Sequence, residues 1–349
     1  MKKIAVIVTC MFLAGISLSL QAQIISVTSG TDFNIVANTV IAADSMDITP
    51  ASDFTINGSS LVRSNVVNNS TSFPYINRVY QFSQPTNAFN GALKVYYNNG
   101  ELNGMPEAAL KTLYHNNISW QPDPETVNNS TNNTVESSVL NATALKEITA
   151  SYFAKLQLKA FLEGFYLSSG LMRSTLYDLE ASTDNTATDS VEINLWSTAN
   201  LSNPSPNYSS KGILHNDGNA TLLFSGFALD SSYYIQVKHR NSVAVWSASP
   251  ISVASTTDYD FTNSLASAYG DGVNPSMKLK SGGKYAIYSG DINQDGGVDI
   301  FDMQQAENDA SKFSYGYNSS DCNGDKSTDI FDMQLIENNA SLFLYTAKP

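Results

Sequence analysis

The chain has 349 residues, among which 32 Asp and Glu outnumber 19 Lys and Arg, and its formal net charge is −13. At roughly 150 residues per domain, this length predicts two or three domains. Such an excess of negative charge is repelled by polyanions, so we expect no nucleic-acid partner.

The first 22 residues have the pattern of a secretory signal peptide. Lys2 and Lys3 precede the apolar run Ile4–Leu20, and an imperfect small-residue cleavage site follows at Ala22. Cleavage there removes 22 of 349 residues, leaves 327, and changes the net charge from −13 to −15. No later apolar stretch reaches the roughly 18 residues of a membrane-spanning helix, so no transmembrane segment is expected in the mature chain. We expect a secreted protein, extracellular or at the cell surface, with the periplasm left open.

Residues 23–150 are expected to form a β-rich N-terminal domain. Short runs rich in β-branched and aromatic residues, such as Phe33–Val36, Val79–Phe82 and Leu93–Tyr97, alternate with gaps of Asn, Ser, Thr and Gly. This spacing is typical of an antiparallel sandwich or barrel. Pro106–Leu113 predicts one short helical turn.

Residues 151–285 alternate apolar and polar side chains more clearly, which predicts half-buried strands. The predicted strands are Lys155–Phe161, Val191–Leu195, Ala220–Phe224, Tyr233–His239 and Ser242–Ser249. With about seven strands, this domain resembles the immunoglobulin- and fibronectin-type sandwiches, an architecture that carries little functional information. Tyr259–Asn274 is expected to be a loop or an irregular edge.

Residues 291–313 repeat at 321–343, an offset of 30, and 14 of the 23 aligned positions are identical. Both copies place oxygen-bearing side chains at positions 1, 3, 5, 9 and 12 of a loop, with a backbone carbonyl at position 7. This is the spacing of a 12-residue calcium loop, because calcium takes six to eight oxygen ligands. The predicted ligands are Asp291, Asn293, Asp295, Gly297, Asp299 and Asp302 at site one, and Asp321, Asn323, Asp325, Ser327, Asp329 and Asp332 at site two.

The repeat length predicts a loop followed by one helix in each copy. An offset of 30 leaves 18 residues between the two loops, which is too short for the two flanking helices of an EF-hand. Each helix is expected to begin near loop position 12. An apolar stripe along each helix is predicted to form the core, consisting of Met303, Ala306, Ala310 and Phe313 in copy one and Met333, Ile336, Ala340 and Phe343 in copy two.

Two calcium ions are expected, bound with different affinities. Residues 288–349 carry a net charge of −8, which calls for a counter-ion. In loop two, Lys326 replaces the glycine at position 6, where a left-handed backbone is wanted, and Thr328 replaces the apolar residue at position 8. We therefore expect site one to bind more tightly than site two. Cys322, at position 2, is expected to point away from the ion.

This duplicated loop–helix unit resembles the type I dockerin family over about 60 residues, 288–347, and the match lies in the ligand positions of both loops. It is also similar to the dockerin-like ends of secreted Bacteroidetes proteins. The resemblance implies two calcium ions, two roughly antiparallel helices, and docking onto a cohesin-like or other surface protein receptor.

In that family the receptor contacts loop positions 10 and 11 and helix positions 17 and 18. The residues at these positions are identical in the two copies: Ile300, Phe301, Glu307 and Asn308, and Ile330, Phe331, Glu337 and Asn338. Two identical surfaces would let one partner bind in either orientation. The competing interpretation is that the Ile and Phe side chains are buried between the helices. Family members more often have small hydroxyl residues at positions 10 and 11, so we expect a receptor other than a cellulosomal cohesin.

The rest of the sequence carries no catalytic motif. Gly-x-Ser-x-Gly, His-Glu-x-x-His and phosphate-loop patterns are absent, and His115, His215 and His239 lack metal-ligand spacing. Lys238–Arg240 is a small basic spot that is expected to be a turn. Some aromatic residues could stack on sugars, although core packing is the commoner use. They are Tyr96, Tyr97, Trp120, Trp196, Tyr208, Tyr233, Tyr234 and Trp246.

Together these patterns predict a mainly β protein in which two β-sandwich-like domains precede a small α-helical, dockerin-like module. The expected boundaries are 1–22 for the signal peptide, 23–150 and 151–285 for the β domains, and 286–349 for the calcium-binding module. The expected function is calcium-dependent attachment or assembly. The alternatives are an accessory carbohydrate-binding component of a polysaccharide-degrading system, a polysaccharide hydrolase with an unrecognised site, or a module that only caps the chain.

Overall fold

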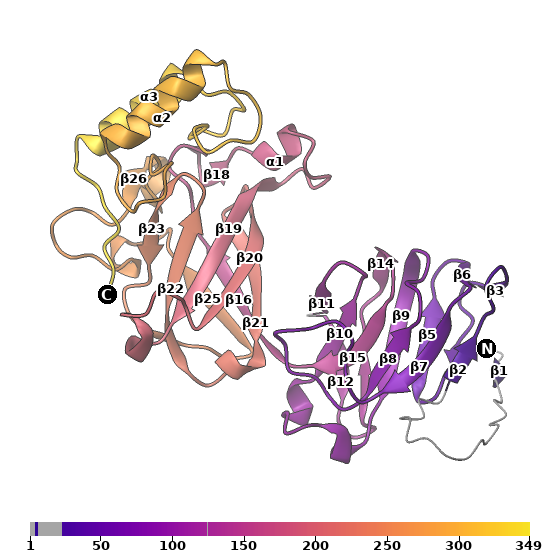
Figure 1. Ribbon diagram of the computed structural model, residues 1–349. Coiled ribbons are helices and arrows are strands. Elements are labelled where there is room, and N and C mark those ends of the chain that lie inside the picture. Colours follow the sequence, from indigo (N-terminus) through magenta and orange to yellow (C-terminus); the bar gives the residue numbers. More distant parts are fainter. Residues whose placement is uncertain (1–3, 6–22, 124) are drawn as a thin grey trace. The chain divides into compact units, whose positions relative to one another are not determined.

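The computed structural model describes residues 4–5, 23–123 and 125–349, and these residues form a mainly β protein, as predicted (Figure 1). The predicted signal peptide, 1–22, lies outside the described residues except for Ile4–Ala5. The chain divides into two compact units. The first runs to Phe153 and includes Ser225–Phe227, and the second comprises Ala154–Phe224 and Ala228–Pro349.

The first unit contains two large sheets. One has the strand order β1-β4-β5-β9-β13-β12, with β14 also paired to β9, and the other has the order β11-β10-β15-β8-β7-β2, while β3 pairs with β6. The strands are β1 (Ile4–Ala5), β2 (Gln23–Ser26), β3 (Asp32–Ile35), β4 (Ile41–Ala42), β5 (Met46–Pro50), β6 (Phe54–Asn57), β7 (Ser60–Ser64), β8 (Val79–Phe82), β9 (Phe89–Tyr96), β10 (Lys111–His115), β11 (Trp120–Pro122), β12 (Val127–Asn129), β13 (Thr134–Glu136), β14 (Leu140–Thr143) and β15 (Glu147–Ser151).

Both sheets of the first unit contribute to one apolar core, which makes the unit a β-sandwich. Ile48 of β5 and Leu93 of β9 come from one sheet, and Leu61 of β7 and Phe82 of β8 come from the other. Alternate residues along β9 are buried, as the period of two in a strand requires. The expected helical turn at Pro106–Leu113 is only a three-residue 3-10 turn, since β10 already begins at Lys111.

The second unit packs a three-stranded sheet, β21-β16-β25, and a five-stranded sheet, β20-β19-β22-β23 with β24 on β22, around one core. Two small sheets, β17-β18 and β26-β27, and the short helix α1 (Thr175–Asp178) complete it. The strands are β16 (Phe153–Lys159), β17 (Tyr166–Ser168), β18 (Leu171–Met172), β19 (Ala187–Trp196), β20 (Tyr208–His215), β21 (Asn219–Ser225), β22 (Ser232–His239), β23 (Ser242–Trp246), β24 (Ile251–Ser252), β25 (Thr256–Asp260), β26 (Lys278–Lys280) and β27 (Lys284–Ala286).

One predicted loop of this unit is partly a strand. Residues 256–260 form β25, which pairs in parallel with β16, so the segment expected to be irregular from Tyr259 onward begins inside a sheet. Its polar sequence, Thr-Thr-Asp-Tyr-Asp, has little β signal of its own. The pairing is formed with a strand about a hundred residues earlier in the chain.

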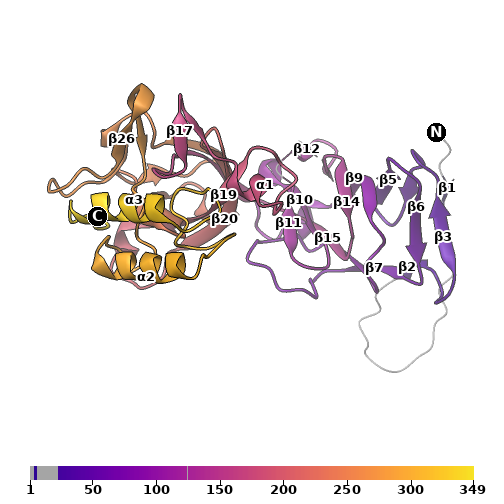
Figure 2. The ribbon, with the colours of Figure 1, turned by 90° about the horizontal axis from the view of Figure 1, so that it is seen from above.

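Each copy of the predicted calcium loop leads directly into one helix, α2 (Ile300–Ser311) or α3 (Ile330–Ala340). The helices begin at loop position 10, not at position 12 as expected, because Asp299 and Asp329 at position 9 cap them by accepting the N–H of the residue two places on. Figure 2 shows α2 and α3 side by side.

The chain after each helix pairs with the loop of the other copy. The Val298 N–H donates to the Leu344 carbonyl and the Thr328 N–H donates to the Ser314 carbonyl, both at 3.0 Å. These pairs are equivalent under the offset of 30, so the module has an internal pseudo-two-fold relation. The end of each helix therefore lies near the start of the other, and the two helices are antiparallel.

Candidate calcium loops and docking face

The first calcium loop arranges its oxygens along a tight turn. The Asn293 side-chain oxygen accepts the Asp295 N–H at 2.8 Å, and Asp295 Oδ1 accepts the Gly297 N–H at 3.1 Å. Asp291 is buried, and its Oδ1 atom has no hydrogen-bond partner among the described residues. A buried carboxylate oxygen without a partner is costly unless a cation or another donor compensates it.

Position 12 is the structural centre of each loop. Asp302 is fully buried, where its Oδ1 accepts the N–H groups of Ile292 and Asn293 and its Oδ2 accepts that of Asp299. Asp332 makes the equivalent three bonds in loop two. One carboxylate therefore ties the start of the loop to the start of the helix.

The second loop repeats these contacts and adds its own. Asp321 is buried and accepts the N–H groups of Gly324 and Asp325 on Oδ1 and that of Lys326 on Oδ2. Asp325 Oδ1 accepts the Ser327 N–H at 3.1 Å. All twelve predicted ligand residues thus lie on the two loops or at the helix starts.

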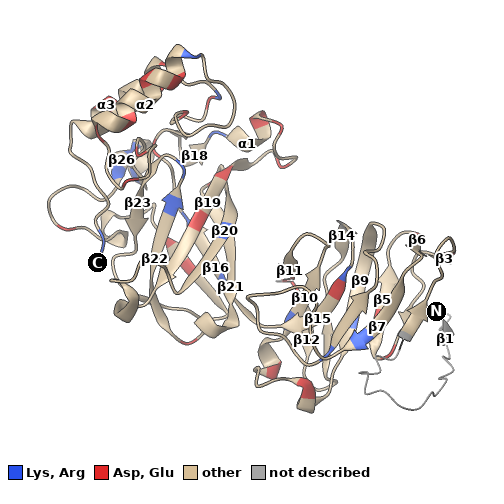
Figure 3. Cartoon of the chain, in the orientation of Figure 1, with Lys and Arg blue, Asp and Glu red and all other residues tan. Residues whose placement is uncertain are grey.

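The loops concentrate negative charge in a partly buried space, and Figure 3 shows acidic residues on α2 and α3. Burial, followed by the nearby carboxylates of Asp302 and Asp295, raises the pKa of Asp291 to about 7. Burial is also the main cause that raises the pKa of Asp321 to about 6 and that of Asp332 to about 7. The ionised carboxylates therefore repel one another, and a divalent cation would relieve that repulsion.

The donor chemistry of the loops fits calcium. Within the described parts of the chain, no three His, Cys, Asp or Glu side chains converge as a metal-holding group. Each loop instead mixes Asp carboxylates, an Asn amide oxygen and a backbone carbonyl, which are the hard oxygen donors that calcium takes. Cys322 is buried in the module core, and burial raises the pKa of its thiol.

Backbone strain does not distinguish the two sites. Each loop has left-handed residues at positions 4 and 6: Gln294 (φ 60°) and Gly296 (φ 96°) in loop one, Gly324 (φ 74°) and Lys326 (φ 81°) in loop two. Glycine occupies position 6 in loop one and position 4 in loop two, so each loop has one strained residue that is not glycine. The strain at Lys326 that favoured a weaker site two is therefore matched by Gln294.

The predicted docking residues are exposed in both helices. Ile300, Phe301, Ile330 and Phe331 are 61–69% exposed, and the Glu-Asn pairs 307–308 and 337–338 are exposed as well. Burial of the Ile and Phe side chains between the helices, the competing interpretation, is therefore wrong. Large apolar side chains that remain this exposed mark a candidate interaction site.

Exposure and repeat identity coincide in this module. Of the 14 identical positions, five are predicted ligands and nine are not. Seven of these nine are exposed in both copies, and the other two, the Met and Ala of the stripe, are partly buried. We define the docking face as these seven positions in both copies: Ile300, Phe301, Gln304, Glu307, Asn308, Ser311 and Phe313, and Ile330, Phe331, Gln334, Glu337, Asn338, Ser341 and Phe343.

The two phenylalanines at the helix ends were expected in the core and are instead on the surface. Phe313 is 89% exposed and Phe343 81% exposed. Each follows the end of its helix in a left-handed conformation, with φ of 55° and 52°, so the helical period no longer directs its side chain inward. Identity of the two copies was the sequence signal that could have assigned these residues, with Gln304 and Ser311, to the docking face.

Two of the positions at which the copies differ pack against the sandwich of the second unit. Gly324 stands where copy one has Gln294, and a Cβ there would lie 2.5 Å from the Phe165 ring. Asn339 stands where copy one has Asp309, and it donates to Glu163 at 2.6 Å. An aspartate at position 339 would place two carboxylates together.

A buried polar cluster contributes to this interface. Asp189 on β19 lies 3.1 Å from His239 Nε2, accepts the Arg240 Nε–H at 2.9 Å, and accepts the Tyr317 hydroxyl at 2.7 Å. Burial alone would raise the pKa of Asp189, but His239, the Arg240 guanidinium and the Tyr317 hydroxyl hold it well below its usual range. The basic spot at 238–240, expected to be only a turn, is thus a contact between sandwich and module.

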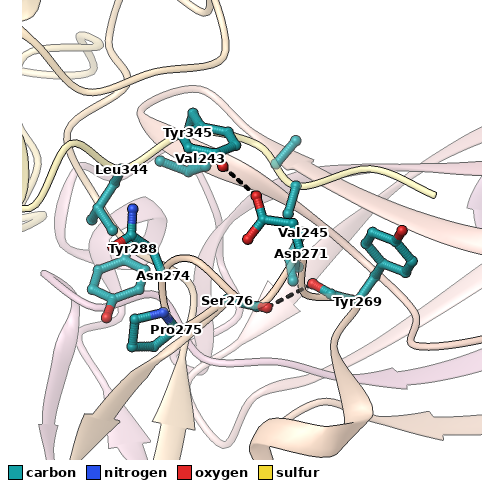
Figure 4. A pocket seen from close by; sticks show the side chains of 12 residues that line it. Val243, Val245, Tyr269, Asp271, Asn274, Pro275, Ser276, Tyr288, Leu344 and Tyr345 are labelled. Atoms are coloured by element: carbon teal, nitrogen blue, oxygen red, sulfur yellow. Dashed lines mark hydrogen bonds between the residues drawn. The ribbon is translucent and has the colours of Figure 1, made fainter.

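The chain after α3 is also held by the sandwich, beside a small pocket (Figure 4). The Tyr345 hydroxyl donates to the Asp271 carboxylate, and the Asn274 amide donates to the Phe343 carbonyl at 3.3 Å. Val243 and Leu344 line the same pocket. These contacts fix the segment that pairs with calcium loop one.

The aromatic residues considered for sugar stacking are not exposed. Tyr97, Trp196, Tyr233 and Trp246 are buried, and the other four are partly buried. Trp196 and Trp246 pack on each other with ring centroids 5.6 Å apart. Their burial favours core packing over a carbohydrate platform.

Comparison with known proteins does not show which family this chain belongs to. No protein-family model and no curated protein matches it. Two solved mutants of a type II cohesin–X-dockerin complex from Acetivibrio cellulolyticus are similar at 10% identity over 56% of this chain and 96% of theirs. The C-terminal interface mutant has a TM-score of 0.32 and the N-terminal one 0.31, values too low to show a common fold.

In the described part of the chain, no helix is long and apolar enough to cross a bilayer.

Proposed function

We propose that this is a secreted calcium-binding protein whose C-terminal module, residues 288–347, is dockerin-like and mediates calcium-dependent attachment to a surface protein receptor. The observation that carries the proposal is the docking face: seven non-ligand positions are both identical between the copies and exposed in both. A role in the core, or as a cap on the chain, explains why buried residues are identical in the two copies. It does not explain why exposed residues are identical.

Calcium would act structurally in this proposal. Without it, buried carboxylates such as Asp291 and Asp332 repel their neighbours, and the energy of metal binding becomes folding energy for the loops. The loops lead directly into α2 and α3, so ordering them fixes the helix starts, where Ile300, Phe301, Ile330 and Phe331 lie. Calcium therefore controls whether the docking face has its binding-competent shape.

The pseudo-two-fold relation implies that either helix can present the same face. Replacing Phe301 alone or Phe331 alone then leaves one intact copy and retains binding, whereas replacing both abolishes it. An exposed aromatic that becomes buried at an interface contributes more than about 1 kcal/mol, or more than roughly fivefold in affinity, when it is an anchor.

The test is capture from the envelope and secretome of the producing cell by the immobilised full chain, in calcium and then in chelator. We expect one protein to be retained only in calcium, to be lost with the pair Asp302→Ala and Asp332→Ala, and to be lost with Phe301→Ala plus Phe331→Ala. Ile118→Ala, which removes a similarly exposed apolar side chain from the first unit, is the matched control. The receptor is then identified and its affinity for each variant is measured.

Retention that ignores calcium, or that survives the double phenylalanine variant, would disprove docking through this face. If the protein binds two calcium ions but retains nothing, the repeats stabilise the chain without docking it.

A further inference from the structure

The turn between β22 and β23 of the sandwich lies at the start of both calcium loops. Arg240 donates to the Asn318 carbonyl ahead of loop two and stacks on the Tyr317 ring, 4.6 Å from its centroid. On the other side, Ser242 forms a β-bridge with Ser289 ahead of loop one. We call residues 240–243 the loop-bridging turn.

Asn241, at the centre of this turn, contacts both loops with one residue. Its side-chain amide donates to the carbonyl of Asp321, the first ligand residue of loop two, at 2.8 Å. Its own carbonyl accepts the N–H of Gly290, which immediately precedes Asp291 of loop one, at 2.7 Å. Asn241 is fully buried, so neither bond competes with water.

Val243, the last residue of the turn, adds an apolar connection between the loops. It packs in a core with Ile292 and Val298 from loop one and Cys322 from loop two. The loops therefore share one apolar core, to which the sandwich contributes Val243, and one buried amide, that of Asn241.

We propose that Asn241 is a positioning residue that couples the two calcium sites, so that an ion at one loop raises the affinity of the other. The inference depends on calcium binding at both loops, as proposed above. An ion in loop one fixes the backbone at Gly290 and Asp291. The ordered Gly290 N–H then holds the main-chain carbonyl of Asn241. The side-chain amide of Asn241 in turn fixes the Asp321 carbonyl before the second ion binds. Such coupling must be reciprocal.

The experiment is a double-mutant cycle on the full chain titrated with calcium alone. Wild type, Asp302→Ala, Asn241→Ala and the double variant are compared, with the backbone NMR signals of residues 322–328 reporting occupancy of loop two. We expect Asp302→Ala to weaken loop two by about fivefold or more, the lower range of measured couplings. In the Asn241→Ala background the same change should have little effect.

Two further variants keep the test decisive. Asn241→Leu keeps the volume without the N–H donor and replaces Asn241→Ala if the latter does not fold, as judged by fluorescence of the buried Trp196 and Trp246. Asn203→Ala, in an exposed loop, is the control and should retain the full coupling. The proposed coupling would be overturned if Asp302→Ala changed the calcium affinity of loop two equally with and without Asn241→Ala, or changed it in neither case. Calcium binding itself would remain supported by either result. Absence of calcium binding in the wild type would instead reject the proposed function.

Discussion

Gly324, in the second predicted calcium loop, lies in close contact with the sandwich. Its φ of 74° is left-handed, and a Cβ would lie 2.5 Å from both the Phe165 ring and Thr175 Oγ1. Gly324→Ala is expected to destabilise the second unit by about 2–4 kcal/mol, through the strain of a left-handed backbone and overpacking together. Gln294→Ala at the equivalent position of loop one should change stability by less than about 1 kcal/mol, because Gln294 is exposed. Urea unfolding measures both, and equal effects would contradict the close seating of loop two.

Asp189 should make the stability of the second unit pH-dependent. Its pKa is lowered in the folded protein, so its contribution is fully present above the unfolded value of about 3.9 and is lost as the pH falls further. Asp189→Asn, which leaves the partly buried Arg240 without a counter-charge, should cost roughly 3–5 kcal/mol at neutral pH. The difference between the two proteins in urea midpoint, measured in chelator, should narrow as the pH falls below about 4. A constant difference down to pH 2.5 would refute the ion-pair role.

At the scale of single residues, the ligand spacing predicted which side chains line the loops, because it is a local property of the sequence. Exposure of Ile300 and Phe301 could not be predicted, since apolar residues at a helix start are compatible with both a core and a surface. Asn241 and Asp189 gave no signal at all, because their partners Asp321 and Tyr317 lie 80 and 128 residues away along the chain.

The residue that follows each of the helices α2 and α3 has a strained backbone conformation, which lowers the stability of the protein. Phe313 and Phe343 occupy the left-handed position after each helix, where glycine is the usual residue. Phe313→Gly and Phe343→Gly should each stabilise the protein by up to about 1 kcal/mol in thermal unfolding, because they remove strain and little packing. The two substitutions together should weaken receptor binding if the phenylalanines belong to the docking face, whereas either one alone leaves one copy of the face intact. Loss of stability on substitution would show that the side chains pack after all.

Elements with a strong local pattern were predicted well. The strands β8, β19, β21 and β22 follow the alternation of apolar residues, and the two helices follow their calcium loops. The helix starts were placed two residues late, although Asp299 and Asp329 with Asp302 and Asp332 form capping boxes that the sequence displays. β25 was missed because its polar sequence depends on pairing with β16, a contact distant in the chain.

For the molecule as a whole, removing calcium should affect one unit and spare the other. Both loops belong to the second unit, where Asn241, Asn339 and Gly324 join them to the sandwich, so bound ions stabilise sandwich and module together. At a calcium concentration one hundred times the dissociation constant, each site should add about 2.7 kcal/mol. Chelator should therefore lower the unfolding transition of the second unit and leave that of the first unit unchanged. Amide hydrogen exchange reports on each unit separately, through β19 and β22 in the second unit and β8 and β9 in the first. The control is the double variant Asp302→Ala and Asp332→Ala, in which calcium should have no effect. A calcium shift confined to residues 288–347, with β19 and β22 unaffected, would mean that the module unfolds independently and that its contacts with the sandwich transmit nothing.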